Sequence, residues 1–287
     1  YPRIIHGELL THRLLSRNAR SSRAVPVKTM LLETTSIPFI PWHWGKNQKG
    51  MQASEECNEL IVPQHWIGDG GLTREQAWLQ ARDGAVDMAE GFMQAGYHKQ
   101  IPNRLLEPFS WIDTLVTSTD WDNFLWLREH GDAEPHLQDL AALVHQAIEA
   151  AEIQKLEPGE WHLPYITQDD SKEYKRRYES GDQDFNFLMK ISAARCARIS
   201  YKPFNGDASY ERELERYDSL VTADRVHASP LEHQASPDML CYIAIQEKPG
   251  KLGFRREWID PKLHGNFDGY IQYRKTIPNE AKMEGVL

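Results

Sequence analysis

Residues 11–23 read THRLLSRNARSSR, a run in which arginines alternate with serines and one asparagine. An arginine guanidinium makes bidentate contacts with phosphate, and hydroxyl and amide side chains complete the shell around an anion. The stretch therefore predicts an anion-binding site, with a solvated basic loop as the alternative. Within residues 1–28 the carboxylate of Glu8 is opposed by the basic side chains His12, Arg13, Arg17, Arg20, Arg23 and Lys28.

The chain as a whole is acidic, in contrast to this segment. Its 287 residues include 33 lysines and arginines against 42 aspartates and glutamates, a formal charge of −9. Hydrophobic residues make up 40% and charged residues 26%, which excludes a disordered, collagen-like or disulfide-rich chain. No stretch approaches the length of an apolar membrane span, and no secretory signal is recognisable, so we expect a cytoplasmic protein that does not enter a membrane.

Cysteine and histidine spacing gives no indication of a metal centre. Cys57, Cys196 and Cys241 lie far apart and follow no ligand pattern, which is typical of free thiols in a reducing compartment. The twelve histidines form no HExxH or comparable motif, so a metal hydrolase is disfavoured and no metal site is predicted.

Two segments predict long helices. In residues 73–95, Thr73 and Gln76 form a capping box and Gly96 follows the end. A second helix is expected from Pro135 to about residue 151. Apolar residues at the helical period predict one buried face on each, formed by Trp78, Ala81, Ala85, Met88 and Phe92 in the first and by Leu137, Leu140, Ala141, Val144, Ile148 and Ala151 in the second.

The remaining elements complete an expected α+β fold of mixed helices and antiparallel sheet. Residues 109–119 predict a strand, residues 210–220 an amphipathic helix, and the glycine-rich tail strands and turns. Residues 168–184 are nearly all polar or charged, so we expect a charged linker or a short exposed helix. We predict that residues 1–287 form a single catalytic domain with this linker between its two halves.

The arginine-rich run resembles the signature RHRxxSxNxxSxR of the flavin-dependent thymidylate synthases, from which only Thr11 departs. A second family-like block, roughly AARxSF, a helix and GHxSPxEH, resembles ARCARISY at 194–201 and HASPLEH at 227–233. The family places this block before the arginine-rich motif, whereas here it follows, so the chain resembles a circularly permuted member. A third element, NFLWLR at 123–128, follows the motif as it does in the family.

The resemblance implies a flavin-dependent thymidylate synthase fold in permuted order and the reductive methylation of dUMP to dTMP. It implies FAD as cofactor, methylenetetrahydrofolate and NADPH as co-substrates, and a homotetramer. Arg13 and His12 would be catalytic, and no cysteine nucleophile is needed. By the same resemblance, FAD would contact His12, Arg13, Ser200, His227, Ser229 and Asn123, and the nucleotide would contact Glu8, Ser21, Ser22, Arg23 and Arg274.

Several positions depart from the family pattern near the nucleotide. Glu8 and Ala19 replace the usual glutamine and the usual acidic or amide residue, and Thr119 and Gln146 fall near the places of two arginines. Arg274 lies in GYIQYRKTIPNE at 269–280, which is either a degenerate second copy of the motif or a strand with an exposed basic end. Donors that could replace the missing arginines are Arg17, Arg20, Arg104 and Arg274.

Three other interpretations stay open. A carboxylate at Glu8 accepts from an amino group, so the substrate could be dCMP or a modified dUMP. The basic segment together with Trp42, Trp44 and Trp66 could instead bind a single-stranded nucleic acid. The charge of −9 disfavours that interpretation. Taken without the resemblance, His227 and His233 would indicate only a hydrogen-bonded turn.

Overall fold

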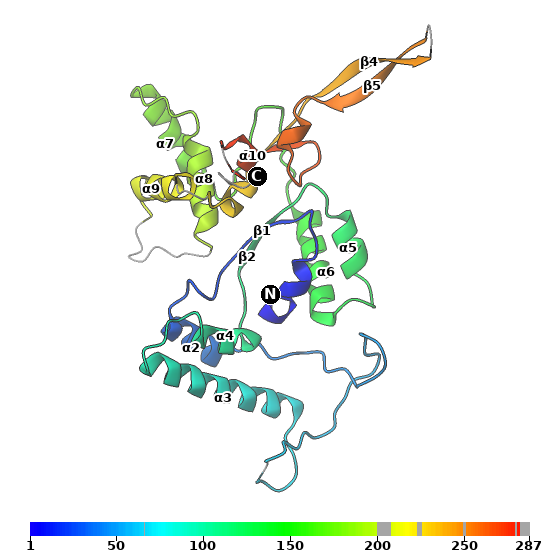
Figure 1. The fold of residues 1–287 in the computed structure, drawn as a ribbon, viewed down its shortest axis with the longest axis vertical. Helices are drawn as coiled ribbons and strands as arrows, with labels where there is room; N and C mark the ends of the chain where they lie inside the picture. Colours follow the sequence, from blue (N-terminus) through cyan, green and yellow to red (C-terminus); the bar gives the residue numbers. More distant parts are fainter. Residues whose placement is uncertain (66, 200–207, 223–225, 249–250, 279, 282–287) are drawn as a thin grey trace, which may run out of the picture. The chain divides into compact units, whose positions relative to one another are not determined.

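A computed structural model describes residues 1–65, 67–199, 208–222, 226–248, 251–278 and 280–281. It confirms a mixed α+β chain, drawn in Figure 1, and divides it into two compact units. Unit 1 contains residues 1–12, 20–113 and 121–152, and unit 2 contains residues 13–19, 114–120 and 153–287. Each unit is described by itself.

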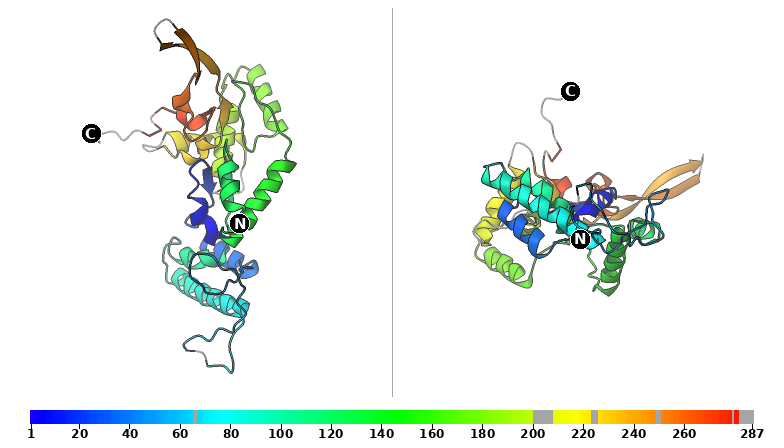
Figure 2. Two further views of the ribbon diagram at one scale, coloured as in Figure 1. Left: turned by 90° about the vertical axis from the view of Figure 1, so that its right-hand side faces the viewer. Right: turned by 90° about the horizontal axis from the view of Figure 1, so that it is seen from below.

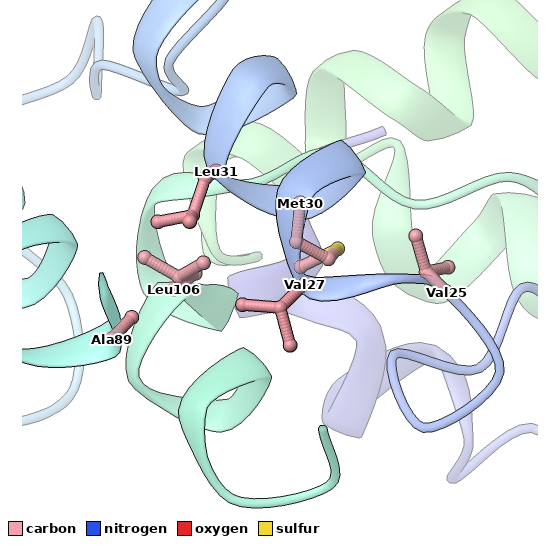
Figure 3. Close-up of a cluster of buried hydrophobic side chains, with 6 residues drawn as sticks. All are labelled: Val25, Val27, Met30, Leu31, Ala89 and Leu106. Atoms are coloured by element: carbon pink, nitrogen blue, oxygen red, sulfur yellow. The ribbon is translucent and has the colours of Figure 1, made fainter. Parts of the chain in front are cut away.

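Unit 1 is helical throughout its described elements. Its short helices are η1 (Arg3–Ile5), α1 (His6–Leu9), α4 (Pro102–Leu106) and η2 (Glu107–Phe109). The longer ones are α2 (Val27–Ser36), α3 (Arg74–Gln94), α5 (Asp122–Arg128) and α6 (Pro135–Ala150). Figure 3 shows the core that α2, α3 and α4 share, formed by Val25, Val27, Met30, Leu31, Ala89 and Leu106.

Helix α3 confirms the predicted capping box, but its buried face differs from the predicted one. Thr73 accepts a hydrogen bond from the Gln76 backbone, and the Gln76 side chain accepts one from the Thr73 backbone. Ala89 is fully buried, whereas Met88 is 57% exposed. Helices α2 and α4 pack against one side of α3. The residues of α3 that face them are centred on Ala89 and therefore differ from the predicted set.

Helix α6 begins at Pro135 as predicted, and the Glu134 side chain accepts a hydrogen bond from Leu137 N at 2.8 Å. Only the first half of the predicted stripe is buried in unit 1, at Leu137 and Ala141, while Ile148 is exposed. The predicted strand over residues 109–119 is shorter than expected: η2 ends at Phe109, and the strand β2 of unit 2 spans only Thr114–Thr117.

Unit 2 combines three antiparallel strand pairs with helices. Strand β1 (Ser16–Ala19) pairs with β2 (Thr114–Thr117), β3 (Ala235–Pro237) with β6 (Tyr270–Gln272), and β4 (Leu240–Lys248) with β5 (Lys251–Trp258). Figure 2 shows β4 and β5 as a two-stranded ribbon in two further directions. The remaining elements of unit 2 are α7 (Gln168–Glu179), α8 (Phe187–Ala197), α9 (Tyr210–Val221), η3 (Ser229–Glu232), η4 (Pro261–Leu263) and α10 (Tyr273–Thr276).

Two expectations for unit 2 have different outcomes. Helix α9 confirms the amphipathic helix predicted over residues 210–220, and its Tyr217 is buried with Ala193, Leu231 and Tyr273. Most of the segment expected as a linker or short exposed helix is α7, capped by Thr167, and it is not wholly exposed because Asp170 is buried. No helix within the described ranges is both long and apolar enough to cross a membrane.

Candidate functional site

The start of the arginine-rich motif meets helix α5 in unit 1. His12 is buried, and its Nε2 accepts a hydrogen bond of 2.8 Å from Nε of Arg128. Another nitrogen of the Arg128 guanidinium lies 3.6 Å from a carboxylate oxygen of Glu8. The guanidinium therefore holds the imidazole and the carboxylate together, although Arg128 lies 116 positions from His12 in the sequence.

Helix α5 also fixes the plane of the His12 ring. The ring of Phe124 lies edge-on to the imidazole, with the centroids 5.0 Å apart, and Trp121 lies edge-on to Phe124. Asn123, on the same helix, is exposed. The segment NFLWLR thus positions His12 through Phe124 and Arg128, and it leaves the amide of Asn123 accessible for a ligand.

The second half of the motif separates into free and engaged side chains. Ser21 is partly buried and Arg23 is exposed, and neither side chain has a partner among the described residues. Ser22 is buried, and its hydroxyl donates to Glu107 at 2.5 Å. Arg20 makes two hydrogen bonds to Glu33, of 2.8 and 3.0 Å. Of the predicted nucleotide contacts in this stretch, Ser21 and Arg23 keep free donors, whereas Ser22 is bonded within the protein.

In unit 2 the middle of the motif is joined to the second family-like block. The side-chain amide of Asn18, on β1, donates a hydrogen bond of 2.5 Å to the carbonyl oxygen of Cys196 at the end of α8. Both groups are buried. The sequences THRLLSRNARSSR and ARCARISY therefore touch through a specific buried contact.

The end of the second block is joined to strand β2. Nδ1 of His233 lies 2.9 Å from the hydroxyl of Thr117, and the ring is completely buried. Burial lowers the pKa of His233 to about 3, so the ring stays neutral at physiological pH. His233 thus belongs to the buried hydrogen-bonding network of unit 2.

The predicted flavin contacts of unit 2 differ in accessibility. Arg13, His227 and Ser229 are exposed, and their side chains have no partner in the described part of the chain. The backbone N–H of His227 donates to Leu220 O at 2.9 Å. Ser200 lies outside the described residues, as does Trp66 of the nucleic-acid interpretation.

Arg274 is engaged rather than free. It lies in α10, so the strand expected around it is limited to the residues before the helix. Its guanidinium donates to Glu232 and, at 2.6 Å, to Glu280. A nucleotide would have to compete with both carboxylates for this arginine.

Sequence reasoning missed Arg128 as a candidate site residue. The available signal was its position at the end of NFLWLR, directly after a segment that already resembled the family. Its contact with His12 spans 116 positions of the sequence, so no local pattern revealed it. No group of three His, Cys, Asp or Glu side chains that could hold a metal ion occurs within the described ranges.

Comparisons with known proteins identify no relative of this chain, so its function is inferred from its own residues. No protein-family model matches the sequence, and searches of curated proteins and of solved structures return no match.

Proposed function

We propose that this protein is a flavin-dependent thymidylate synthase in permuted order, which methylates dUMP with methylenetetrahydrofolate and NADPH as co-substrates. The observation that carries the proposal is the 2.5 Å hydrogen bond from Asn18 to the Cys196 carbonyl. It joins the two family-like blocks inside unit 2. Contacts depend on position in space and not on chain order, so a permuted chain can still bring the two blocks together, and this pairing supports the proposal.

The donor chemistry fits FAD. The guanidinium of Arg13 and the hydroxyl of Ser229 are exposed donors without partners among the described residues, and such groups bind the oxygens of a pyrophosphate. His227, in the same unit as Arg13 and Ser229, is also exposed and offers an imidazole to the cofactor. When bound, FAD in reduced form supplies the hydride for the reductive methylation.

The chain's own residues bind and orient the nucleotide. Ser21 and Arg23 offer a hydroxyl and a two-pronged cation to the nucleotide phosphate. Arg13 adds positive charge, which stabilises negative charge that develops on a pyrimidine carbonyl. His12 is fixed by Arg128, so its orientation is established before a ligand arrives.

Glu8 favours a second candidate substrate, dCMP or a modified uridylate. Its carboxylate is half-exposed, contacts Arg128 on one oxygen and retains lone pairs that can accept from an exocyclic amino group. A glutamine here could both donate and accept. In this proposal the choice of pyrimidine depends on one side-chain atom, which is an oxygen acceptor in Glu8 and would be a nitrogen donor in glutamine.

A flavin titration tests the proposal. We expect the absorption bands of FAD to shift when the protein is added and to shift again with dUMP. Arg13→Ala should weaken FAD binding by about tenfold or more, the loss of one charged hydrogen bond. Arg256→Ala, on the exposed ribbon of β4 and β5, is the matched control and should leave FAD binding unchanged.

The same titration distinguishes the substrates. If dCMP and not dUMP shifts the flavin bands, and Glu8→Gln reverses the preference, the second candidate is correct. Absence of FAD binding, together with salt-sensitive binding of a single-stranded oligonucleotide, would contradict both and favour a nucleic-acid binder.

A further inference from the structure

Unit 1 contains a cavity of about 400 Å³ that none of the predicted flavin or nucleotide residues lines. We call it the tryptophan cavity. Its volume is within the range of small-molecule sites. The walls come from the loop before α3 and from α3 and α6, with Ile4 of η1, and the residues used below are His43, Trp44, Glu59, Arg74, Trp78 and His136.

Two perpendicular indole rings form a corner of the tryptophan cavity. Trp44 and Trp78 have centroids 6.1 Å apart and an angle of 85° between their planes. The indole N–H of Trp78 donates to the carbonyl oxygen of Phe39 at 2.7 Å, which fixes that ring. The faces of indole rings are electron-rich and attract cations, as the Arg74 guanidinium over the Trp44 ring illustrates.

Backbone pairing keeps the walls in place without a ligand. Gly45 pairs with Glu56, and Ile61 pairs with Leu72 just before α3. A side chain at position 45 would lie 2.1 Å from Cβ of Ala53, so only glycine fits this close approach. The corner is therefore preorganised, which lowers the entropy lost on binding.

The uncompensated charge of the cavity is negative. Arg74, whose guanidinium lies 5.7 Å from the centre of the Trp44 ring, is paired with Glu56 and Glu75. His43 is bonded to Asp139. Glu59 is exposed and has no partner among the described residues, so its carboxylate is available to a ligand.

His136 adds an unsatisfied polar atom to the same wall. Its ring is 5% exposed, and its Nδ1 lies 2.6 Å from a carboxylate oxygen of Glu134. Its Nε2 has no hydrogen-bond partner among the described residues. His136 is therefore a buried part of the cavity wall whose Nε2 makes no hydrogen bond to the described residues.

We propose that the tryptophan cavity binds a small alkylammonium ion, with the indole faces of Trp44 and Trp78 around the cationic head and the Glu59 carboxylate as its counter-charge. This site is independent of the flavin proposal, because it shares no residue with it. A neutral flat heterocycle would gain from the indole faces but not from Glu59.

Tryptophan fluorescence measures binding directly, with choline as the probe. We expect a saturable change with choline, and at least about fivefold weaker binding of its neutral isostere 3,3-dimethylbutan-1-ol. Sodium chloride at equal ionic strength should give no saturable change. Equal responses to choline and the isostere, or a response to sodium chloride alone, would overturn the proposal.

A pair of variants on one loop locates the counter-charge. Glu59→Gln should weaken choline binding by about fivefold, the effect of losing one partly exposed charge contact. Glu55→Gln is the matched control, because Glu55 pairs with Lys46 and does not line the cavity. Circular dichroism checks that both variants are folded. If folded Glu59→Gln binds choline as tightly as the control, the proposal is wrong.

Discussion

Helices α3 and α7 begin with the same local arrangement, a threonine cap and a polar side chain three residues later that bonds back to it. At α3 the pair is Thr73 and Gln76, and both are exposed. At α7 the pair is Thr167 and Asp170, and Asp170 is 1% exposed. One capping box therefore faces water with both side chains, while the other has an exposed threonine and a buried aspartate.

The difference lies in the further partners of Asp170. Its two carboxylate oxygens accept hydrogen bonds from Arg195 on α8, at 2.6 and 2.8 Å, and one also accepts from the Tyr210 hydroxyl at 2.9 Å. Among the described residues, Gln76 makes only the bonds of its own cap. The comparison teaches that the same sequence signal can either cap the start of one helix or also tie three helices together. Which of the two occurs depends on whether side chains of other helices bond to the capping residue.

The largest expected effect is at Asp170. Asp170→Ala leaves the Arg195 guanidinium without its buried counter-charge, so we expect the free energy of unfolding to fall by about 3 kcal/mol or more. Urea denaturation followed by circular dichroism measures the change. Asp169→Ala is the control, because Asp169 is exposed and pairs with the exposed Lys172, and its cost should stay below about 0.5 kcal/mol. Equal costs for the two variants would show that the buried contacts of Asp170 add nothing to stability beyond those of an exposed aspartate.

The next largest expected effect is the loss, in acid, of the stability that Asp170 contributes. Burial alone would raise the pKa of Asp170, but hydrogen bonds from Arg195, Thr167 and Tyr210 outweigh it and hold the pKa below its ordinary value of 3.8. A depressed folded-state pKa stabilises the fold fully above the unfolded value, and this contribution is lost as pH falls through the folded value. The stability difference between wild type and Asp170→Asn should thus be constant from pH 7 to pH 5 and narrow below about pH 4. Urea midpoints across this range provide the measurement, and a difference that widens in acid would contradict the assignment.

The smallest expected effects are at α3. Thr73→Ala removes the cap acceptor and should cost about 1 kcal/mol, whereas Thr73→Ser keeps the hydroxyl and should cost less than half of that. Hydrogen exchange at the first turn of α3 should increase in the alanine variant alone. Unchanged exchange in Thr73→Ala would show that tertiary packing, and not the cap, holds the start of α3.

The same pair of helices shows what the sequence could predict of the fold. Helix α3 combines a cap with apolar residues at the helical period, so both its start and its type were accessible. Helix α7 has the sequence QDDSKEYKRRYE with no apolar stripe, and ion pairs of Glu173 with Arg176 and Arg177 support it. Its capping box was present in the sequence, but the burial of Asp170 depends on Arg195 and Tyr210, which no local pattern reveals.

The candidate site shows the same division. The spacing in residues 11–23 predicts which side chains bind an anion, and this stays a prediction. Arg13 and Arg23 are exposed and have no partners in the described structure. The spacing could not predict that Ser22 bonds to Glu107 or that Arg128 fixes His12, because these partners lie 85 and 116 positions away. Long-range pairing decides which donors remain available for a ligand.

The thiol of Cys196 gives the buried contact with Asn18 a practical use. Cys196 is completely buried, and burial raises the pKa of its thiol to about 12, while Cys57 and Cys241 are partly exposed. An alkylating reagent requires an accessible thiolate, so it would label Cys57 and Cys241 first. Cys196 would then be labelled only as fast as the end of α8 opens to solvent. The alkylation rate of this one sulfur atom therefore measures the rate of local opening in unit 2.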